Sequence, residues 1–312
     1  MDFEKTTGYF RSSNGLYNTA YYIYTPVNTG IKGVFQIVHG MCEYIARYED
    51  FIDFLCGNGF VVCGNDHIGH GASINSDDDL GFFADKNGWR YLVKDVVTLT
   101  RMMQEKYSSF PYYILGHSMG SLVLRTALAK YSELYDGALI LGTISLNFGA
   151  DAALAIIESA AKIKGNHFRS KKLDRIMFGM SNIKIEKPLT EYDWVSSDRE
   201  VVNRYAEDPH CTFIFTVRAM YDLVMMVKYV SSKDWAGKVA DYLPVFIAGG
   251  SDDPVGRYGR CLTDLFKRMT DAGSTDAELH IYPDMRHEIL NEIDKQEVYD
   301  DILDWLNEHI ED

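Results

Sequence analysis

The 312-residue sequence lacks the features that mark several large classes of protein. It has no run of about 18 apolar residues, which a membrane-spanning helix would need, and no basic start followed by an apolar stretch, which marks a secretory signal. It has only seven prolines, and no proline-rich, serine-rich or repeated segment that would indicate linkers or solenoid repeats. These absences favour one large globular domain, or one domain with an insertion.

Basic residues are scarce: 31 Lys and Arg stand against 45 Asp and Glu, giving a formal net charge of -14. Sequence-independent binding to nucleic acid requires a basic surface, so we expect no nucleic-acid partner. The same charge disfavours simple adsorption to anionic lipid, and nothing predicts stable insertion in a membrane. We interpret the charge as a well-solvated acidic surface.

Cysteine is also infrequent, and the residues of this type are scattered without CxxC or another metal-site spacing. They are Cys42, Cys56, Cys63, Cys211 and Cys261. An odd number of unclustered cysteines is typical of reduced thiols, so the sequence predicts a cytoplasmic protein. The glycine-rich phosphate loops GxGxxG and GxxxxGK[ST] are likewise missing, and we expect no nucleotide cofactor.

Short apolar runs alternate with helical patterns from residue 16 to 142, and again from about residue 243 to the end. The runs expected to be parallel strands are 33–38, 60–65, 112–115, 138–141, 243–248 and 279–282. Residues 18–24 before them are expected to form an antiparallel edge strand. Apolar residues at steps of three and four, from Trp89 to Met103, predict a helix packed on the sheet. The predicted fold is therefore α/β, with a mostly parallel sheet covered by helices on both faces.

Residues 147–230 break this alternation, because they contain helical stretches such as 152–164 and 213–230 and no convincing strand. We predict that they form a helical cap inserted into a core of residues 1–146 and 231–312. Such an insertion would lie over the strand ends where catalytic loops collect. The apolar run from Leu154 to Ile157 fits either an acyl-chain site or packing against the core.

The sharpest local pattern is Gly116-His117-Ser118-Met119-Gly120, which directly follows the strand YYIL and precedes the helical run SLVLRTALAK. A GxSxG string is informative in this strand-turn-helix context, because the tight turn leaves no room for side chains at the flanking glycines and projects the serine hydroxyl outward. The context predicts that Ser118 is a nucleophile.

A serine nucleophile needs a base within hydrogen-bond reach and an acid to orient that base. His287 follows a late predicted strand and lies after the acidic candidates, so it is the expected base. Asp252 and Asp253 both follow the strand LPVFIA, and Asp284 is a weaker third candidate. From position alone, the choice between Asp252 and Asp253 stays open.

Ester hydrolysis also needs N–H donors for the oxyanion. We expect one donor to be the backbone N–H of Met119, and the second to be that of Met41, which follows the strand GVFQIV and Gly40. Gly40, His117 and Val255 adjoin these positions and are predicted to bind substrate.

The string Asp66-His67-Ile68-Gly69-His70-Gly71 resembles a metal site, with two histidines and an aspartate close together. We interpret it as a structural turn that supports the site, because no further ligand cluster would close a coordination shell. The prediction is that the chain uses neither a metal nor an organic cofactor.

Taken together, several motifs resemble the monoacylglycerol lipase and lysophospholipase group of α/β hydrolases. They are HGMCEYIARY from His39, DHIGHG from Asp66, GHSMG from Gly116, SDDPVG from Ser251, RHEILNE from Arg286 and, at the cap border, the stretch from Thr190 to Cys211. The resemblance implies that Asp253 is the acid and that Met41 and Met119 supply the oxyanion donors.

Two residues depart from this group, which more often has histidine at the position of Tyr44 and a small residue at that of Met41. Residues 147–189 resemble it least, and these would set acyl-chain and head-group preference. The sequence therefore predicts a serine hydrolase acting on a small-molecule acyl ester, of monoacylglycerol or lysophospholipid type, with transient contact at a lipid interface.

Two alternatives stay open beside this prediction. One is a carboxylesterase or thioesterase for short or aromatic acyl groups. The other is a non-catalytic ligand-binding protein that keeps the fold. The sequence leaves the oligomeric state open.

Overall fold

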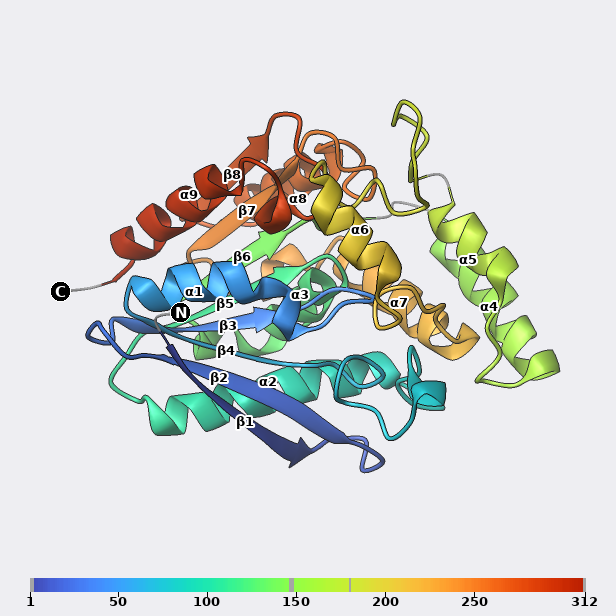
Figure 1. Ribbon diagram of the computed structural model, residues 1–312, viewed down its shortest axis with the longest axis horizontal. Coiled ribbons are helices and arrows are strands. Elements are labelled where there is room, and N and C mark those ends of the chain that lie inside the picture. Colours follow the sequence, from blue (N-terminus) through green and yellow to red (C-terminus); the bar gives the residue numbers. More distant parts are fainter. Residues whose placement is uncertain (1–2, 146–148, 180, 311–312) are drawn as a thin grey trace.

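The computed structural model describes residues 3–145, 149–179 and 181–310, which form one central sheet flanked by helices (Figure 1). The strand order is β1-β2-β4-β3-β5-β6-β7-β8. β1 and β2, and β2 and β4, pair antiparallel, and every later neighbour in this order pairs parallel. The strands are β1 (Phe3–Arg11), β2 (Asn18–Pro26), β3 (Gly33–Val38), β4 (Phe60–Asn65), β5 (Tyr112–His117), β6 (Gly137–Leu141), β7 (Val245–Gly250) and β8 (Ala277–Tyr282).

Both faces of the sheet are covered by helices, as the α/β prediction requires. α1 and α9 contribute to the hydrophobic cluster on one face, and α2, α3, α7 and α8 contribute to that on the other. The α-helices are α1 (Glu49–Gly57), α2 (Gly88–Lys106), α3 (Met119–Tyr131), α4 (Ala150–Lys164), α5 (Lys171–Phe178), α6 (Arg199–Glu207), α7 (Val217–Val230), α8 (Arg260–Asp271) and α9 (Lys295–Glu308). Short 3-10 helices cover Ile45–Tyr48, Asp77–Asp79, Ser132–Leu134, Ala236–Lys238 and Ile289–Asn291.

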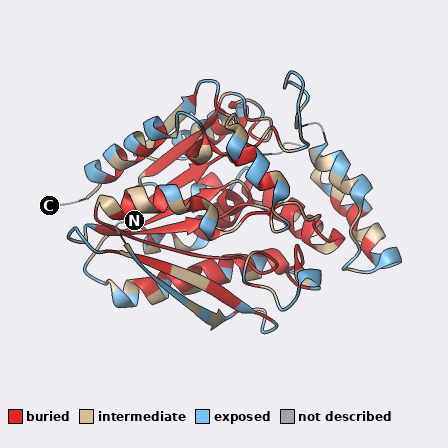
Figure 2. Ribbon diagram, viewed as in Figure 1, coloured by how far each residue is buried: buried red, intermediate tan, exposed pale blue. Residues whose placement is uncertain are grey.

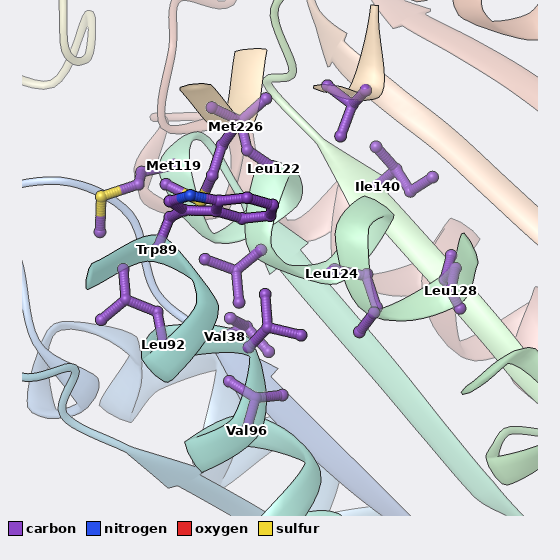
Figure 3. Packing of buried hydrophobic residues seen from close by; sticks show 14 of the residues in the cluster. Val38, Trp89, Leu92, Val96, Met119, Leu122, Leu124, Leu128, Ile140 and Met226 are labelled. Atoms are coloured by element: carbon purple, nitrogen blue, oxygen red, sulfur yellow. The ribbon is translucent and has the colours of Figure 1, made fainter. Parts of the chain in front are cut away.

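The two hydrophobic clusters follow from the alternation of side chains along each strand. In β3, Val34 belongs to the cluster under α2 and α3, whereas its neighbour Phe35 belongs to the cluster under α1 and α9. Because both faces are buried, β3 is apolar almost throughout. Figure 3 shows the first cluster, where Trp89 of α2 lies near Met119 at the start of α3.

The prediction that residues 18–24 form the edge of the sheet was wrong. β2 pairs with β4 on one side and with β1 on the other, so β1 is the edge strand. β1 has the sequence FEKTTGYFR and leaves most of its side chains exposed, as its pale blue and tan ribbon shows (Figure 2). It was missed because an exposed edge strand carries no apolar run.

Within residues 149–179 and 181–230 the structure has the helices α4 to α7 and no strand, apart from one isolated β-bridge between Arg169 and Thr216. α7 packs into the cluster around α2 and α3, whereas α4 and α5 lie at the periphery (Figure 1). The predicted boundary between residues 146 and 147 lies outside the described residues, so the division into core and cap stays a prediction. No described helix is long and apolar enough to cross a membrane.

Candidate active site

Ser118 occupies the sharp turn between β5 and α3, with a φ of 52° and a ψ of -119°. A positive φ is unusual for serine and marks a strained backbone. A Cβ on Gly120 would lie 1.9 Å from the carbonyl oxygen of Val38, and one on Gly116 would lie 2.6 Å from the carbonyl oxygen of Gly120. The two flanking glycines are therefore required by the close packing of the turn, which leaves Ser118 only partly buried.

His287 and Asp253 are brought together from the loops after β8 and β7. Nδ1 of His287 lies 3.0 Å from Oδ1 of Asp253, and the two side chains are only 3% and 1% exposed. The distance is that of a hydrogen bond, but the geometry is not, because Nδ1 of His287 has no hydrogen-bond partner of good geometry. The second carboxylate oxygen of Asp253, Oδ2, also has none. The two side chains therefore lie in close buried contact.

The structure distinguishes the three candidate acids. Asp253 is buried, and its Oδ1 accepts a hydrogen bond of 2.8 Å from the backbone N–H of Val255. Asp252 and Asp284 are both exposed, and the N–H of Asp284 is bonded to Oγ of Ser251. Of the three, only Asp253 contacts His287 in the interactions described.

The two expected oxyanion donors belong to chain segments that adjoin Ser118. Met119 is the first residue of α3, where backbone N–H groups have no partner within the helix and carry partial positive charge. β3 lies beside β5, with Val38 opposite Gly116. A Cβ on Gly40 would lie 3.0 Å from the Cβ of Ser118, so the chain leading to Met41 runs directly beside the serine.

The loop carrying His287 is fastened to residues 193–196, a connection that sequence reasoning missed. Arg286 donates from Nη1 to the carbonyl oxygens of Asp193 and Ser196, at 2.6 and 2.8 Å. The backbone N–H groups of His287 and Glu288 donate to the carbonyl oxygens of Trp194 and Val195, at 3.4 and 2.8 Å. The centre of the Trp194 ring lies 5.2 Å from that of the His287 ring. Backbone acceptors leave no side-chain signature, so no sequence pattern could have indicated this tie.

Glu43 is a second residue that sequence reasoning missed, and it binds several groups close to the site. Its Oε1 accepts hydrogen bonds from the backbone N–H of Gly40, from the Tyr48 hydroxyl at 3.0 Å and from Nδ1 of His117 at 3.0 Å. It is 2% exposed. Since Gly40 precedes Met41 and His117 precedes Ser118, Glu43 fixes the two loops that flank the nucleophile. An acidic residue in the otherwise weakly polar string HGMCEY was the available signal.

Glu43 and His117 each favour the charged form of the other. Burial disfavours the cationic form of His117, but the Glu43 carboxylate outweighs burial and raises the pKa of His117. Burial likewise opposes ionisation of Glu43, yet His117 and Arg47 lower the pKa of its carboxyl group. Nε2 of His117 then donates to the carbonyl oxygen of His287 at 3.2 Å, which ties the ion pair to the predicted base.

Polar groups of the three residues predicted to bind substrate have protein partners. The ring nitrogens of His117 face Glu43 and the His287 carbonyl, the Gly40 N–H donates to Glu43, and the Val255 N–H donates to Asp253. These polar groups position the neighbouring site residues. Direct contact of Gly40, His117 and Val255 with substrate stays a prediction.

The segment from Asp66 to Gly71 forms a buried turn. Asp66 accepts hydrogen bonds from the N–H groups of Ile45 and Ala72, at 3.0 and 2.8 Å, and from the Tyr22 hydroxyl at 2.9 Å. His67 donates from its N–H to Nε2 of His39 at 2.8 Å. Burial lowers the pKa of His67 to about 4 and that of His70 to about 3, so both rings are neutral at pH 7. Within the described residues, no group of three or more potential ligands could hold a metal ion.

A surface hollow of about 440 Å³ is lined by residues 129–130, 132–133, 237–242 and 272. These residues precede β6, β7 and β8, whose opposite ends lead to the site. The hollow therefore lies at the other edge of the sheet from Ser118.

Similar known proteins match most of the chain. The family described as serine aminopeptidase, S33, matches residues 29–294. The monoacylglycerol lipase of Mycolicibacterium smegmatis is 27% identical over 293 residues, which are 93% of each chain. A thermostable carboxyl esterase from Bacillus coagulans, solved in complex with glycerol, is 31% identical with a TM-score of 0.91 over the whole of both chains. A soluble variant of Saccharomyces cerevisiae monoglyceride lipase, at 21% identity and a TM-score of 0.75 over 98% of this chain and 96% of its own, shares the fold.

These matches confirm the α/β-hydrolase fold and the resemblance to the monoacylglycerol lipase group, and together they support a serine ester hydrolase. The chain belongs to the serine aminopeptidase S33 family.

Proposed function

We propose that this chain cleaves acyl esters of monoacylglycerol or lysophospholipid type through an acyl-enzyme formed on Ser118. The observation that carries the proposal is the buried contact between Asp253 and His287 at the strand ends, beside the strained turn that presents Ser118. The likeness to the Mycolicibacterium smegmatis monoacylglycerol lipase over 93% of both chains supports the substrate class.

In this mechanism His287 takes the hydroxyl proton of Ser118 as the oxygen attacks the ester carbonyl carbon. The N–H groups of Met41 and Met119 donate to the oxyanion that forms. The imidazolium then gives its proton to the leaving alcohol oxygen. Water, deprotonated by His287, then attacks the acyl-enzyme and forms a second tetrahedral intermediate. As this intermediate collapses, the imidazolium returns its proton to the Ser118 oxygen and the fatty acid is released. Asp253 stabilises the imidazolium in both halves and needs no change of protonation. No metal or organic cofactor takes part in these steps.

We propose further that residues 147–230 act as a cap over this site. Leu154 and Ile157 of α4 are buried in the same hydrophobic cluster as Met119, and Met41 packs against that cluster. We propose that a fatty acyl chain bound at Ser118 contacts apolar side chains of this cluster. The same contacts also stabilise the packing of α4 on α7.

A second candidate, a carboxylesterase for short acyl groups, is favoured by the 31% identity to the Bacillus coagulans carboxyl esterase. It would use the same three residues and the same oxyanion donors. The two functions differ in the length of acyl chain that the site accepts, so the substrate profile distinguishes them.

The test is labelling with a fluorophosphonate probe followed by mass spectrometry, with Ser118→Ala as control. Monoacylglycerols of increasing chain length, lysophospholipids, nitrophenyl esters and an aminoacyl amide compete with the probe. We expect one adduct, on Ser118, which long-chain monoacylglycerol blocks best. Steady turnover after an initial burst of alcohol then shows that the acyl-enzyme is hydrolysed.

Other outcomes would replace the proposal. Best protection by acetate or butyrate esters would assign the carboxylesterase function. Best protection by the aminoacyl amide would assign a peptidase, in line with the description of the family. No adduct in folded protein would favour a ligand-binding protein without turnover.

A further inference from the structure

The carbonyl oxygen of Ser118 belongs to the same peptide group as the N–H of Met119, the first expected oxyanion donor. This oxygen accepts a hydrogen bond of 2.9 Å from the backbone N–H of Ser121, as the carbonyl of a residue before a helix commonly does. It also accepts one of 2.5 Å from the Ser121 hydroxyl. The second bond comes from a side chain, so it depends on the residue at position 121 and not on the helix alone.

The Ser121 hydroxyl has a second partner, Thr143, in the loop after β6. Oγ of Ser121 lies 2.7 Å from Oγ1 of Thr143, and both side chains are fully buried. Oγ1 of Thr143 also accepts a hydrogen bond of 3.1 Å from Nη1 of Arg125 on α3. Arginine can only donate and a hydroxyl has a single hydrogen, so with the Ser121 hydrogen on the Ser118 carbonyl, Thr143 donates to Ser121. Arg125, Thr143 and Ser121 are here named the Arg125 network.

Arg125 is a buried cation whose hydrogen bonds end on neutral oxygens. Besides Thr143, it donates to the carbonyl oxygens of Ile144 and Val230, at 3.1 and 3.0 Å. Its guanidinium lies 4.5 Å from the centre of the Trp235 ring. Burial lowers the pKa of Arg125 to about 9, so the group is still charged at pH 7. A buried charge with neutral hydrogen-bond partners costs stability, and perturbed buried charges are typical of functional sites.

All the hydrogen bonds of the Arg125 network run in one direction, from the cation to the Ser118 carbonyl oxygen. A hydrogen bond accepted by a peptide carbonyl withdraws electrons from the peptide group, so its N–H becomes a better donor, and hydrogen bonds in series strengthen one another. A charged donor at the start of the series adds to this effect. The network therefore acts on the Met119 N–H without contacting the substrate.

We propose that the Arg125 network positions and polarises the Met119 N–H, so that this donor binds the oxyanion more tightly. Its members are positioning residues, because they act through the peptide group that follows Ser118. The proposal rests on the proposed function, which forms an oxyanion beside this N–H in both halves of the reaction. Its effect is expected in the transition state and hardly in substrate binding.

Kinetics and an oxyanion mimic test this proposal. An alkyl trifluoromethyl ketone adds to the Ser118 oxygen as His287 takes the hydroxyl proton, and the carbonyl electron pair moves onto the ketone oxygen to give a tetrahedral oxyanion. With an isotopic label on the carbonyl carbon, NMR reports the pH at which this oxygen becomes charged.

Ser121→Ala and Thr143→Val should each lower kcat for a nitrophenyl ester by about tenfold with little change in KM, because weakening a donor costs less than the roughly 10²-fold of removing one. In both variants the adduct oxygen should become charged at a higher pH than in the unaltered protein. A loss of stability alone would not move this titration.

Thr126→Val is the matched control, because it removes a buried hydroxyl on α3 that donates to the carbonyl oxygen of Leu122 at 2.7 Å. It should lower stability in urea but keep kcat and the adduct titration. Thr143→Ser retains the hydroxyl and should behave as the unaltered protein does. Arg125→Gln, with its folding checked by circular dichroism, removes the charge and should reproduce part of the loss in kcat.

The double variant Ser121→Ala, Thr143→Val should lose no more kcat than Ser121→Ala alone, since the first change already disconnects the second residue. Additive losses, an unchanged adduct titration, or losses equalled by Thr126→Val would overturn the proposal. Full activity of folded Arg125→Gln would also overturn it. In each of these cases the unaltered protein still forms its fluorophosphonate adduct on Ser118, whereas failure of the proposed function would leave it without one.

Discussion

Charged side chains lie in contrasting surroundings at the strand ends and on the peripheral helix α5. Around the site, Glu43, His117 and Asp253 are buried, and their charges are met by named partners at about 3 Å. On α5, Lys171 and Lys172 are exposed to solvent. A buried, paired charge fixes geometry but is costly to break, whereas an exposed charge adds little to stability and stays available to a partner.

The largest expected effect separates chemistry from folding at the site. Ser118→Ala should lower kcat/KM for the best ester by at least about 10⁴-fold, because the nucleophile is removed while the surroundings remain. Its melting temperature should be unchanged or higher, since alanine removes no described side-chain bond. Circular dichroism and ester assays check both values, and residual turnover within about tenfold of the unaltered protein would assign the nucleophile elsewhere.

Next in size is the loss of the buried ion pair. Glu43→Gln keeps the shape but leaves His117 without its counter-charge, so the free energy of unfolding should fall by about 3 kcal/mol. Urea denaturation of Glu43→Gln, His117→Gln and the double variant measures the coupling between the two residues. A coupling below about 0.5 kcal/mol would show that the pair contributes nothing specific.

The same pair predicts how stability depends on pH. The pKa of His117 is raised above its ordinary value of 6.5, so its contribution is fully present below about pH 6.5 and is lost as the pH rises through the raised value. The lowered pKa of Glu43 has the opposite sign, and its contribution is lost as the pH falls through that value. Urea denaturation across pH 4–9 should therefore show a maximum that Glu43→Gln flattens, and an unchanged profile would contradict the assignment.

Most of the core was predictable, because buried strands combine apolar runs with helical stripes between them. β3 and β4 begin and end at the predicted residues, since both faces of each are covered. β1 was not predictable in this way, because its stability comes from pairing with β2 while its side chains face solvent. Hydrophobic patterning detects buried side chains, and the side chains of β1 are mostly exposed.

The candidate site was predictable where a backbone constraint leaves a mark in the sequence. Gly116 and Gly120 are needed because a Cβ would collide with nearby carbonyl oxygens, and they located Ser118. Position along the chain could not distinguish Asp253 from Asp252, because adjacent residues differ only in which one turns inward. The family resemblance implied Asp253, and in the structure Asp253 is buried while Asp252 is exposed. The contacts of Arg286 with backbone carbonyls could not be predicted from residue types at all.

A smaller effect is expected from removing the hydrogen bonds that link the loop carrying His287 to residues 193–196. Arg286→Ala removes both bonds from Nη1, so the loop holding His287 should be less well positioned and kcat should fall by about tenfold with little change in KM. Arg199→Ala is the matched control, since Arg199 also reaches this segment but contacts the Asp193 carboxylate from a more exposed position, with 40% of its side chain accessible. Equal losses of kcat in the two variants would show a general weakening of the segment.

The smallest effect should come from the exposed side of α4. Ile163 is 78% exposed, so Ile163→Ser removes almost no buried area, and the free energy of unfolding should change by no more than about 0.5 kcal/mol. Ile293→Ser, at 67% exposure, should behave alike in urea denaturation. A loss above about 1 kcal/mol for Ile163→Ser alone would mean that this side chain packs against protein in solution, because an exposed side chain contributes little to the free energy of unfolding.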